Sequence, residues 1–434
     1  MLKIPNSTFY KRHKLELEKF IYKKNSLHLV NIKSKNKLLV ETSKTVFLDL
    51  EDDKHLSNID YTKKYDVIVL TDIIENHKDI FTLILKIKTL LSQNGKLIIS
   101  SINSKYRFII YFFEFLNIKD SNRVKNYLKF KNLNKIADSH GLEFQKIYSK
   151  QLFPFKIIYI GNFINKILES LFFYFNLGIK TYIIYRPINN DFVKYSKSII
   201  VPAKNEEGNL QELIERIPNF LNTEIIFAYG ESKDNTLVKM QEIIDVEKRF
   251  NFKLIEQTGK GKANAVWEAL EVVDNDLIAI LDADISVEPE TLINFFNLIE
   301  YNRADFVNGS RLIYEMENNS MRILNKIGNK FFQFFIGKII NENLTDSLCG
   351  TKVFKKKDIE NLKYWQSIFN FKDPFGDFDL IFSAAYSGQK IIELPISYKE
   401  RKYGSTQISR FKDGLKLFTY LLKSFFIFNT SQNV

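Results

Sequence analysis

The segment 277–281, Leu-Ile-Ala-Ile-Leu, is short, apolar and bounded by polar residues, which is typical of a buried strand. Asp282, Ala283 and Asp284 follow it directly. Open α/β sheets bind ligands beyond the carboxyl ends of their strands, so these carboxylates stand where a ligand is expected. Mg²⁺ and Mn²⁺ prefer oxygen ligands and share them with substrate phosphates. The acidic pair therefore predicts a site for such an ion, with helix capping by Asp284 as the simpler alternative.

The composition is that of a globular chain with more than one domain. A length of 434 residues favours two or three domains, and 45% apolar with 26% charged residues is ordinary. We interpret the net charge of +12 as a generally basic surface and expect no nucleic-acid partner. Attraction to anionic lipid or to sugar-nucleotide phosphates stays open.

Targeting signals are not evident. The single Cys349 excludes an intramolecular disulfide and fits a reducing compartment. The first residues lack the apolar core of a signal peptide, and no run of about 18 apolar residues predicts a membrane-spanning helix. We therefore expect a cytoplasmic protein, with peripheral contact to the inner face of the membrane left open.

A polar, Pro-containing break at 186–192 separates two α/β patterns. We expect one domain over 1–190 and a second over 196–425. In the second, strands are predicted at 197–201, 224–228 and 253–256, each followed by a polar turn and a helix start. The turn at 259–265 combines glycines with Lys260 and Lys262, which suits a phosphate beside a helix N-terminus.

This order of motifs resembles the family 2 glycosyltransferases with a GT-A fold, in the branch of dolichyl- and polyprenyl-phosphate sugar synthases. The resemblance implies that the segment with Pro202, Ala203, Asn205 and Glu206 contacts the nucleotide base, and that Asp282 and Asp284 hold the metal and diphosphate. The remaining residues expected to bind the donor are Glu231, Asp234, Lys260, Lys262, Ala283, Arg311 and Arg401. The sequence departs from the family at Tyr229-Gly230, where an acid usually recognises the base, so the nucleotide stays open between UDP and GDP.

The acceptor side is predicted from the segment Phe375-Gly-Asp-Phe-Asp-Leu380. The resemblance places Asp377 at the family's general base, although Gly376 stands where a Glu usually precedes it. Asp379 is the alternative, because one of two acids at the start of a helix often serves only the helix dipole.

The first half resembles the second part of a class I S-adenosylmethionine-dependent methyltransferase. Strands are predicted at 45–50, 65–70, 94–103, 142–144 and 181–185, with a helix at about 79–91. The family's first strand ends in a glycine-rich turn that touches the cofactor, whereas the candidate at 26–33 has no glycine. We expect a Rossmann-like domain that has lost its cofactor; a divergent loop that still binds S-adenosylmethionine is the alternative.

Two stretches suggest apolar surfaces. Phe411, Leu415, Phe418, Leu422 and Phe425 repeat at helical spacing beside Lys412, Lys416 and Lys423. Such a helix fits a membrane interface or the domain's own core equally well. The segment 153–185 is predicted to be an apolar face between the domains.

The sequence thus predicts an inverting glycosyltransferase. It would use a nucleotide-sugar donor, Mg²⁺ or Mn²⁺, and a polyprenyl-phosphate or saccharide acceptor. A bifunctional methyltransferase and glycosyltransferase, or a scaffold of two decayed enzymes, are the alternatives. The acidic pair and Arg401 argue against the scaffold.

Overall fold

The computed structural model contains two compact units, Met1–Asn189 with Phe425–Val434, and Asn190–Ser424. It describes residues 6–31, 44–48, 59–75, 77, 79–106, 130–152, 177–189, 191–314, 323–342, 344–369, 371, 373, 375–401, 403 and 410–429. The polar break expected at 186–192 contains the division between the units. Most of the segment 153–185, predicted as an apolar face, lies outside the described residues.

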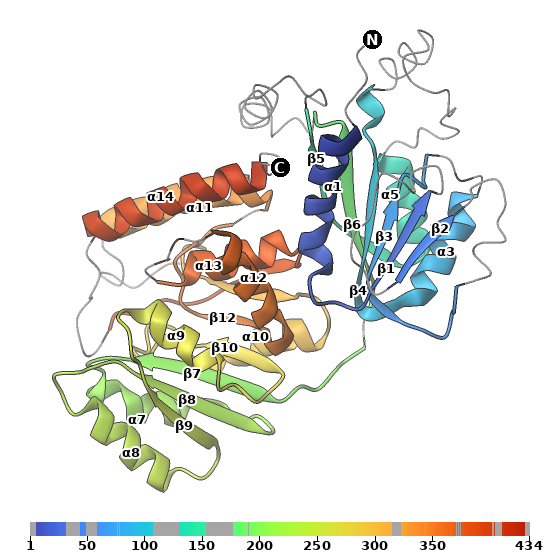
Figure 1. Ribbon diagram of the computed structural model, residues 1–434. Helices are drawn as coiled ribbons and strands as arrows, with labels where there is room; N and C mark the ends of the chain where they lie inside the picture. Colours follow the sequence, from blue (N-terminus) through green and yellow to red (C-terminus); the bar gives the residue numbers. More distant parts are fainter. Residues whose placement is uncertain are drawn as a thin grey trace. The chain divides into compact units, whose positions relative to one another are not determined.

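The first unit is built on a six-stranded sheet in the order β2-β1-β3-β4-β6-β5 (Figure 1). Its strands are β1 (Ser26–Asn31), β2 (Lys44–Leu48), β3 (Tyr65–Thr71), β4 (Leu91–Ile102), β5 (Leu142–Lys150) and β6 (Lys180–Pro187). Strands β1 to β4 are parallel to one another, while β6 runs antiparallel to both β4 and β5. The strands predicted in this half are therefore confirmed, with shifted ends.

Helices cover both faces of this sheet. They are α1 (Asn6–Ile21), α3 (Ile80–Leu90) and α5 (Phe130–Ser139), with a 3₁₀ turn at Ser104–Tyr106. Alternate strand residues face opposite sides, so Ile68 and Leu70 pack with α3 and α5 whereas Val67 and Val69 pack with α1. Asp79 caps α3 by accepting a hydrogen bond of 3.0 Å from the Thr82 amide.

The second unit is built on a seven-stranded sheet in the order β13-β11-β12-β10-β7-β8-β9. Its strands are β7 (Lys197–Ala203), β8 (Thr223–Tyr229), β9 (Asn251–Glu256), β10 (Leu277–Ile280), β11 (Phe306–Ser310), β12 (Lys352–Lys355) and β13 (Ile391–Pro395). Strands β10, β7, β8 and β9 are parallel, and β12 is antiparallel to both of its neighbours. The four strands predicted before the acidic pair are confirmed.

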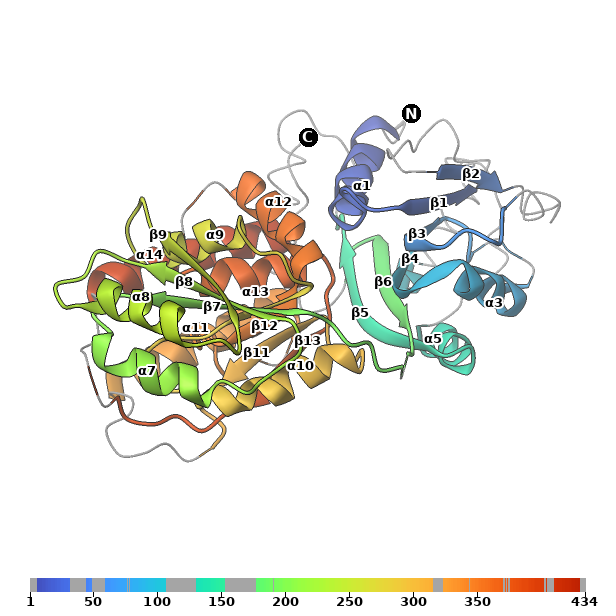
Figure 2. The same ribbon diagram turned by 90° about the horizontal axis from the view of Figure 1, so that it is seen from below.

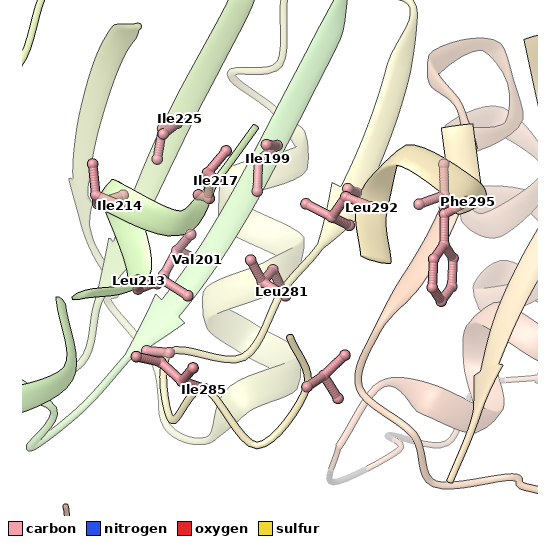
Figure 3. Packing of buried hydrophobic residues seen from close by; sticks show 14 of the residues in the cluster. Ile199, Val201, Leu213, Ile214, Ile217, Ile225, Leu281, Ile285, Leu292 and Phe295 are labelled. Carbon is pink, nitrogen blue, oxygen red and sulfur yellow. The ribbon is translucent and has the colours of Figure 1, made fainter. Parts of the chain in front are cut away.

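Two layers of helices enclose this sheet (Figure 2). The helices are α7 (Glu207–Arg216), α8 (Thr236–Val246), α9 (Lys262–Leu270), α10 (Leu292–Glu300), α11 (Ile323–Ile340), α12 (Ile359–Phe369), α13 (Asp377–Tyr386) and α14 (Arg410–Asn429), with 3₁₀ turns at Pro289–Thr291 and Lys356–Asp358. Helices α7, α8 and α10 share one core with β7, β8 and β10, in which Ile199, Leu213, Ile225 and Leu281 are fully buried (Figure 3).

The order of the strands defines one topological switch point in this sheet. Strand β7 has β8 on one side and β10 on the other, so the chain leaves β7 in one direction and later returns to its opposite edge. The carboxyl ends of β7 and β10 therefore flank a topological switch point, where open α/β sheets bind their ligands. The loop that begins at residue 204 follows β7, and Asp282 to Asp284 follow β10, so both segments lie at this switch point.

None of the helices in the described part of the chain is both long enough and apolar enough to cross a bilayer.

Candidate active site

The two carboxylates of the acidic pair each face a cation. Lys262, the first residue of α9, contacts Asp282 Oδ1 through its Nζ. Arg401 Nη2 lies 2.6 Å from Asp284 Oδ2. The other oxygen of Asp284 accepts hydrogen bonds from the amide and hydroxyl of Ser286, at 2.9 and 2.6 Å. Asp284 is thus a buried, fully engaged carboxylate, whereas the Asp282 side chain is about one third exposed.

Backbone pairing explains how Arg401 reaches Asp284. Val287 and Tyr398 form an antiparallel bridge, and the Lys399 amide donates to the Ser286 carbonyl at 2.9 Å. Between the acidic pair and this bridge stands Ile285 with φ of 54°. A β-branched residue in this left-handed region is strained, and its burial in the core holds it there (Figure 3). The strained turn fixes the direction in which Asp284 leaves the strand.

Close backbone approach explains how Lys262 meets Asp282. Gly261, with φ of 89°, precedes α9 and turns the chain toward the strand ends. A Cβ at Gly350 would stand 2.1 Å from Asp282 Oδ2 and 2.3 Å from Lys262 Nζ, so a larger residue here would displace this ion pair. Burial lowers the pKa of Lys262 while Asp282 and Asp377 raise it, and the net shift is upward. Lys262 is therefore a permanent cation at the site.

The loop after β7 meets the loop after β8 through several polar contacts. The Lys233 amide donates to Asn205 Oδ1 at 2.7 Å, and Asn205 adopts φ of 55°, a conformation that Asn tolerates. Asp234 accepts hydrogen bonds from the Glu207 amide and the Tyr403 hydroxyl, both at 3.3 Å. The side-chain oxygens of Asn205 and Asp234 thus accept hydrogen bonds from other residues of the protein and stabilise these loops.

Glu206 is the titratable group of this loop that responds most to its surroundings. Burial, with the nearby charges of Asp284 and Asp282, raises its pKa from 4.5 to about 7, although Asn209 and Arg401 act in the opposite direction. Asn209 Nδ2 donates to Glu206 Oε2 at 2.6 Å. Glu206 is therefore electrostatically coupled to the acidic pair.

The two acids at the start of α13 have different partners. Asp377 Oδ1 lies 2.6 Å from Lys352 Nζ, and both residues are buried. Asp379 accepts hydrogen bonds from Trp365 Nε1 at 3.2 Å, from Gln366 and from the Tyr420 hydroxyl. Asp379 therefore connects α12, α13 and α14, whereas Asp377 remains on the side of the acidic pair, close enough for its charge to act on Lys262.

Gly376 explains a departure from the family pattern. It forms the N-cap of α13 with φ of 84°, and a side chain here would stand 3.0 Å from Trp267 of α9. The Glu expected from the resemblance would be strained in this conformation and crowded by the indole.

Arg311 is held by the carboxylate of Asp346. Its Nε and Nη2 donate to Asp346 Oδ2 and Oδ1 at 2.7 and 2.9 Å, and the Arg311 amide donates to the same carboxylate at 3.0 Å. Asn329 of α11 also donates to Asp346, at 2.6 Å. This bidentate pair joins the end of β11 to the segment 344–352 and to α11.

Comparison with known proteins characterises part of the second unit. Residues 198–363, from β7 into α12, match the model of glycosyl transferase family 2. This chain carries a family 2 glycosyltransferase domain. The matched range of the glycosyltransferase domain includes the acidic pair, Arg311 and Lys352, while Asp377 and Arg401 lie beyond it.

Two relatives of the glycosyltransferase domain come from different organisms. A low-salt glycan biosynthesis hexosyltransferase of Haloferax volcanii is 28% identical over 52% of this chain and 52% of its own length. A dolichol-phosphate mannosyltransferase of Pyrococcus furiosus is 27% identical over 52% of this chain and 61% of its own length. The chain thus spans little more than half the length of these relatives.

Among solved structures, glucosyl-3-phosphoglycerate synthase of Mycobacterium tuberculosis is 14% identical, with a TM-score of 0.40. It covers 53% of this chain and 78% of its own.

The carboxylate oxygens of the acidic pair in the glycosyltransferase domain suit a divalent ion that also binds phosphates of a substrate. Two carboxylates, Asp282 and Asp284, stand together, and in the described ranges no group of three or more His, Cys, Asp or Glu residues is suited to a metal. Mg²⁺ is usually bound by one or two carboxylates and completed by substrate phosphates. Because Arg401 contacts Asp284 Oδ2, a metal at that oxygen would compete with the guanidinium.

Some expected donor residues are not joined to this group. Glu231 and Lys260 are exposed in the loops after β8 and β9, and no hydrogen bond or ion pair within the described ranges ties them to the acidic pair. Pro202 and Ala203 end β7, and Ala283 is buried between the two acids.

Three residues of the site were not predicted: Lys352 beside Asp377, Gly350 beside Asp282, and Tyr403 beside Asp234. Each depends on contacts between distant segments.

Proposed function

We propose that this chain transfers a sugar from a nucleoside-diphosphate donor to an acceptor, with inversion and with help from Mg²⁺ or Mn²⁺. The observation that carries the proposal is the acidic pair at the switch point, with Lys262 and Arg401 on its two carboxylates. Glycosyl transfer releases a diphosphate, whose growing negative charge needs cations placed in advance. A divalent ion bound there would act as a Lewis acid on that leaving group.

Arg401 and Lys262 would assist the departure directly. Both are paired with carboxylates, and a diphosphate together with its metal offers each of them a stronger anionic partner. If Asp284 held a metal, Arg401 would be released from this carboxylate and could donate to a phosphate oxygen of the donor. Lys262 stands at the first turn of α9, where the helix N-terminus also favours phosphate. UDP and GDP are the candidate nucleotides, with the segment Pro202 to Glu206 toward the base.

Asp377 is proposed as the general base for a hydroxyl acceptor. Its Oδ1 is held by Lys352, so the acceptor proton would pass to Oδ2 while the sugar–phosphate bond breaks and the new glycosidic bond forms. Asp379 is less suited to this role, because three hydrogen bonds from α12 and α14 engage its carboxylate.

We propose a polyprenyl phosphate as the acceptor, with a saccharide as the second candidate. The support comes from relatives named for such lipids, the dolichol-phosphate mannosyltransferase and an undecaprenyl-phosphate 4-deoxy-4-formamido-L-arabinose transferase of Proteus mirabilis. A lipid phosphate lies in a membrane, so this acceptor requires that the protein reach a bilayer surface, which we propose to be the inner face of the cell membrane.

The first unit is proposed to be a methyltransferase-like domain that has lost its cofactor. Strand β1 lies between β2 and β3, so its carboxyl end marks the switch point of this sheet. No glycine is present in β1, and Lys180 forms an ion pair with Asp72 directly after β3. Side chains thus occupy a region where a cofactor would need open backbone.

A screen for donor cleavage tests the glycosyltransferase proposal. The full chain is incubated with UDP- and GDP-sugars, with Mg²⁺, Mn²⁺ or a chelator, and release of nucleoside diphosphate is measured. We expect slow, metal-dependent release from one nucleotide class, accelerated by the correct acceptor. A folded chain that neither binds nor cleaves any of these donors would favour the scaffold alternative.

A further inference from the structure

Helices α11 and α14 expose an unusual set of side chains. In α11, the exposed stripe contains Lys326, Ile327, Lys330, Phe331, Phe334, Phe335 and Lys338. In α14 up to Ser424, it contains Leu415, Lys416, Phe418, Leu422 and Lys423. Every exposed position that the structure describes on these two stretches is therefore either a large apolar residue or lysine. Leu415 is 69% exposed and Phe334 is 54% exposed, where solvent contact is unfavourable for apolar side chains.

The two stripes form one surface, which we call the α11–α14 face and define by the residues just given. Figure 1 shows the two helices side by side on the outer side of the second unit. The rings of Phe331 and Phe418 approach to 6.3 Å between centroids, which joins the stripes. The inward positions Ile336, Ile340, Leu417 and Tyr420 are buried in the domain. The repeat predicted from Leu415 to Leu422 thus faces outward, and Phe411 lies outside the described side chains.

The chemistry of this face identifies its occupant. Apolar rings flanked by lysines are the composition of helices that lie in a membrane interface, with the rings in the acyl region and the ammonium groups at the phosphates. Two α11–α14 faces pressed together would oppose lysine to lysine with no exposed acid to compensate. Asp413, which lies 3.7 Å from Lys416, is only partly exposed. A bilayer with anionic headgroups would bury the apolar side chains in its acyl region and would pair the lysines with its phosphates.

The face is connected to the acceptor side of the site. Asn329 of α11 donates to Asp346, which holds Arg311, and Phe332 packs on Phe378 with centroids 5.5 Å apart. Tyr420 of α14 donates to Asp379, two residues from Asp377. The inner sides of α11 and α14 thus support the residues proposed to meet the acceptor. This arrangement suits an acceptor that stays in the bilayer.

We infer that the α11–α14 face docks this protein on an anionic lipid bilayer, with α11 and α14 lying in the plane of the interface. The inference names a surface outside the proposed site. Docking on a bilayer and the proposed sugar transfer are connected only through the proposed polyprenyl-phosphate acceptor, which lies in a membrane. Vesicle binding needs no donor, metal or acceptor, so its failure is distinguishable from a failure of sugar transfer.

Flotation of the full chain with vesicles tests the inference. Vesicles of phosphatidylcholine alone are compared with vesicles that contain about 30% phosphatidylglycerol as the anionic lipid. We expect wild-type protein to float with the anionic vesicles and weakly with the neutral ones. The double variant F334E/L415E should lower the partition coefficient by roughly tenfold or more, because it places two acids among the apolar anchors. The variant K330Q/K416Q should weaken binding to anionic vesicles only.

The matched control adds the same two charges elsewhere. Val246 and Leu221 are exposed at 80% and 58% on other parts of the second unit, so L221E/V246E should float like wild type. Equal flotation of F334E/L415E and wild type would overturn the inference, as would a wild type that binds neither vesicle. A wild type that is dimeric in solution and becomes monomeric in F334E/L415E, without vesicle binding, would instead assign the face to a second copy.

Discussion

Arg401 and Asp284 form an ion pair of 2.6 Å between residues that are distant in sequence and joined through the bridge of Val287 with Tyr398. Burial lowers the pKa of Arg401, but Asp284 and the neighbouring acids raise it, so the guanidinium stays charged. In the proposed function, Asp284 would hold the metal and Arg401 would contact the diphosphate of the donor. Donor binding would then separate these two side chains.

Arg401→Gln should weaken binding of UDP or GDP in the presence of Mn²⁺ by about tenfold or more, since a hydrogen bond to a charged group is worth roughly 1.5–3 kcal/mol. Calorimetry measures the affinity. Arg216→Gln is the control, because Arg216 pairs with Glu290 on the surface. Unchanged affinity in Arg401→Gln would show that the guanidinium does not reach the diphosphate.

Asp284→Ala should abolish metal-dependent nucleotide binding while the fold survives with reduced stability, because Ser286 and Arg401 lose their partner. Asp276→Ala is the matched control, since this exposed acid stands at the opposite end of β10. Circular dichroism reports the fold and calorimetry with Mn²⁺ reports binding. If Asp284→Ala binds the nucleotide with metal as tightly as wild type, the assignment of the metal site is wrong.

Asp377→Asn should separate the two acceptor classes. A hydroxyl acceptor must lose a proton, so we expect turnover to fall by roughly 10² to 10⁴ with donor affinity unchanged. A lipid phosphate has a second pKa of about 6 and is already largely ionised, so the effect should be much smaller. Steady-state turnover with each acceptor, beside donor affinity, measures the difference.

The buried Lys352 requires a control in that experiment. Asp377→Asn leaves this lysine without its counter-charge, which costs roughly 3–5 kcal/mol for a buried pair. The double variant D377N/K352M removes both charges and should restore stability without restoring turnover. Wild-type transfer to a hydroxyl acceptor in either variant would exclude Asp377 as the base and leave Asp379 as the candidate.

S-adenosylmethionine should not bind detectably to the first unit, because β1 contains no glycine and the ion pair of Lys180 with Asp72 follows the strand ends. Calorimetry or a thermal shift with the full chain measures this. Binding tighter than about 100 μM, roughly −5.5 kcal/mol, would support the bifunctional alternative.

The acids Asp373 and Asp379 should make stability depend on pH. Burial and the charges of Asp379 and Asp377 raise the pKa of Asp373 from 3.8 to about 7. Burial raises that of Asp379 to about 6, against hydrogen bonds from Tyr420, Gln366 and Trp365. An acid whose pKa is higher in the folded than in the unfolded state binds its proton more tightly when the protein is folded. Its contribution to stability is fully present below the unfolded pKa and is lost as the pH rises through the folded pKa, here about 6 to 7.

Denaturant unfolding at pH 5 and pH 8 measures this effect. Asp379→Asn should lose less free energy of unfolding between the two pH values than wild type, since one acid is removed and the pKa of Asp373 falls. Asp276→Asn, at an exposed acid, should keep the wild-type dependence. If Asp379→Asn and wild type lost the same free energy of unfolding between pH 5 and pH 8, the predicted contribution of Asp379 to the pH dependence would be contradicted.

Local pattern was sufficient to predict the strands and the acidic pair. Apolar runs such as 277–281 report burial directly, and polar residues after a strand mark the carboxyl edge of a sheet. The same reasoning identified Lys262 near a helix N-terminus and the α14 repeat. These features depend on residues that are neighbours in sequence or one helical turn apart.

Contacts between distant segments were decided only by the tertiary structure. The sequence could not tell that Lys352 would pair with Asp377, that Tyr420 would bind Asp379, or that Asp346 would engage Arg311. It also left open whether Leu415, Phe418 and Leu422 would face the core or solvent, and the structure exposes them. A helical repeat fixes which residues share a face, but packing of the other helices determines which face is buried.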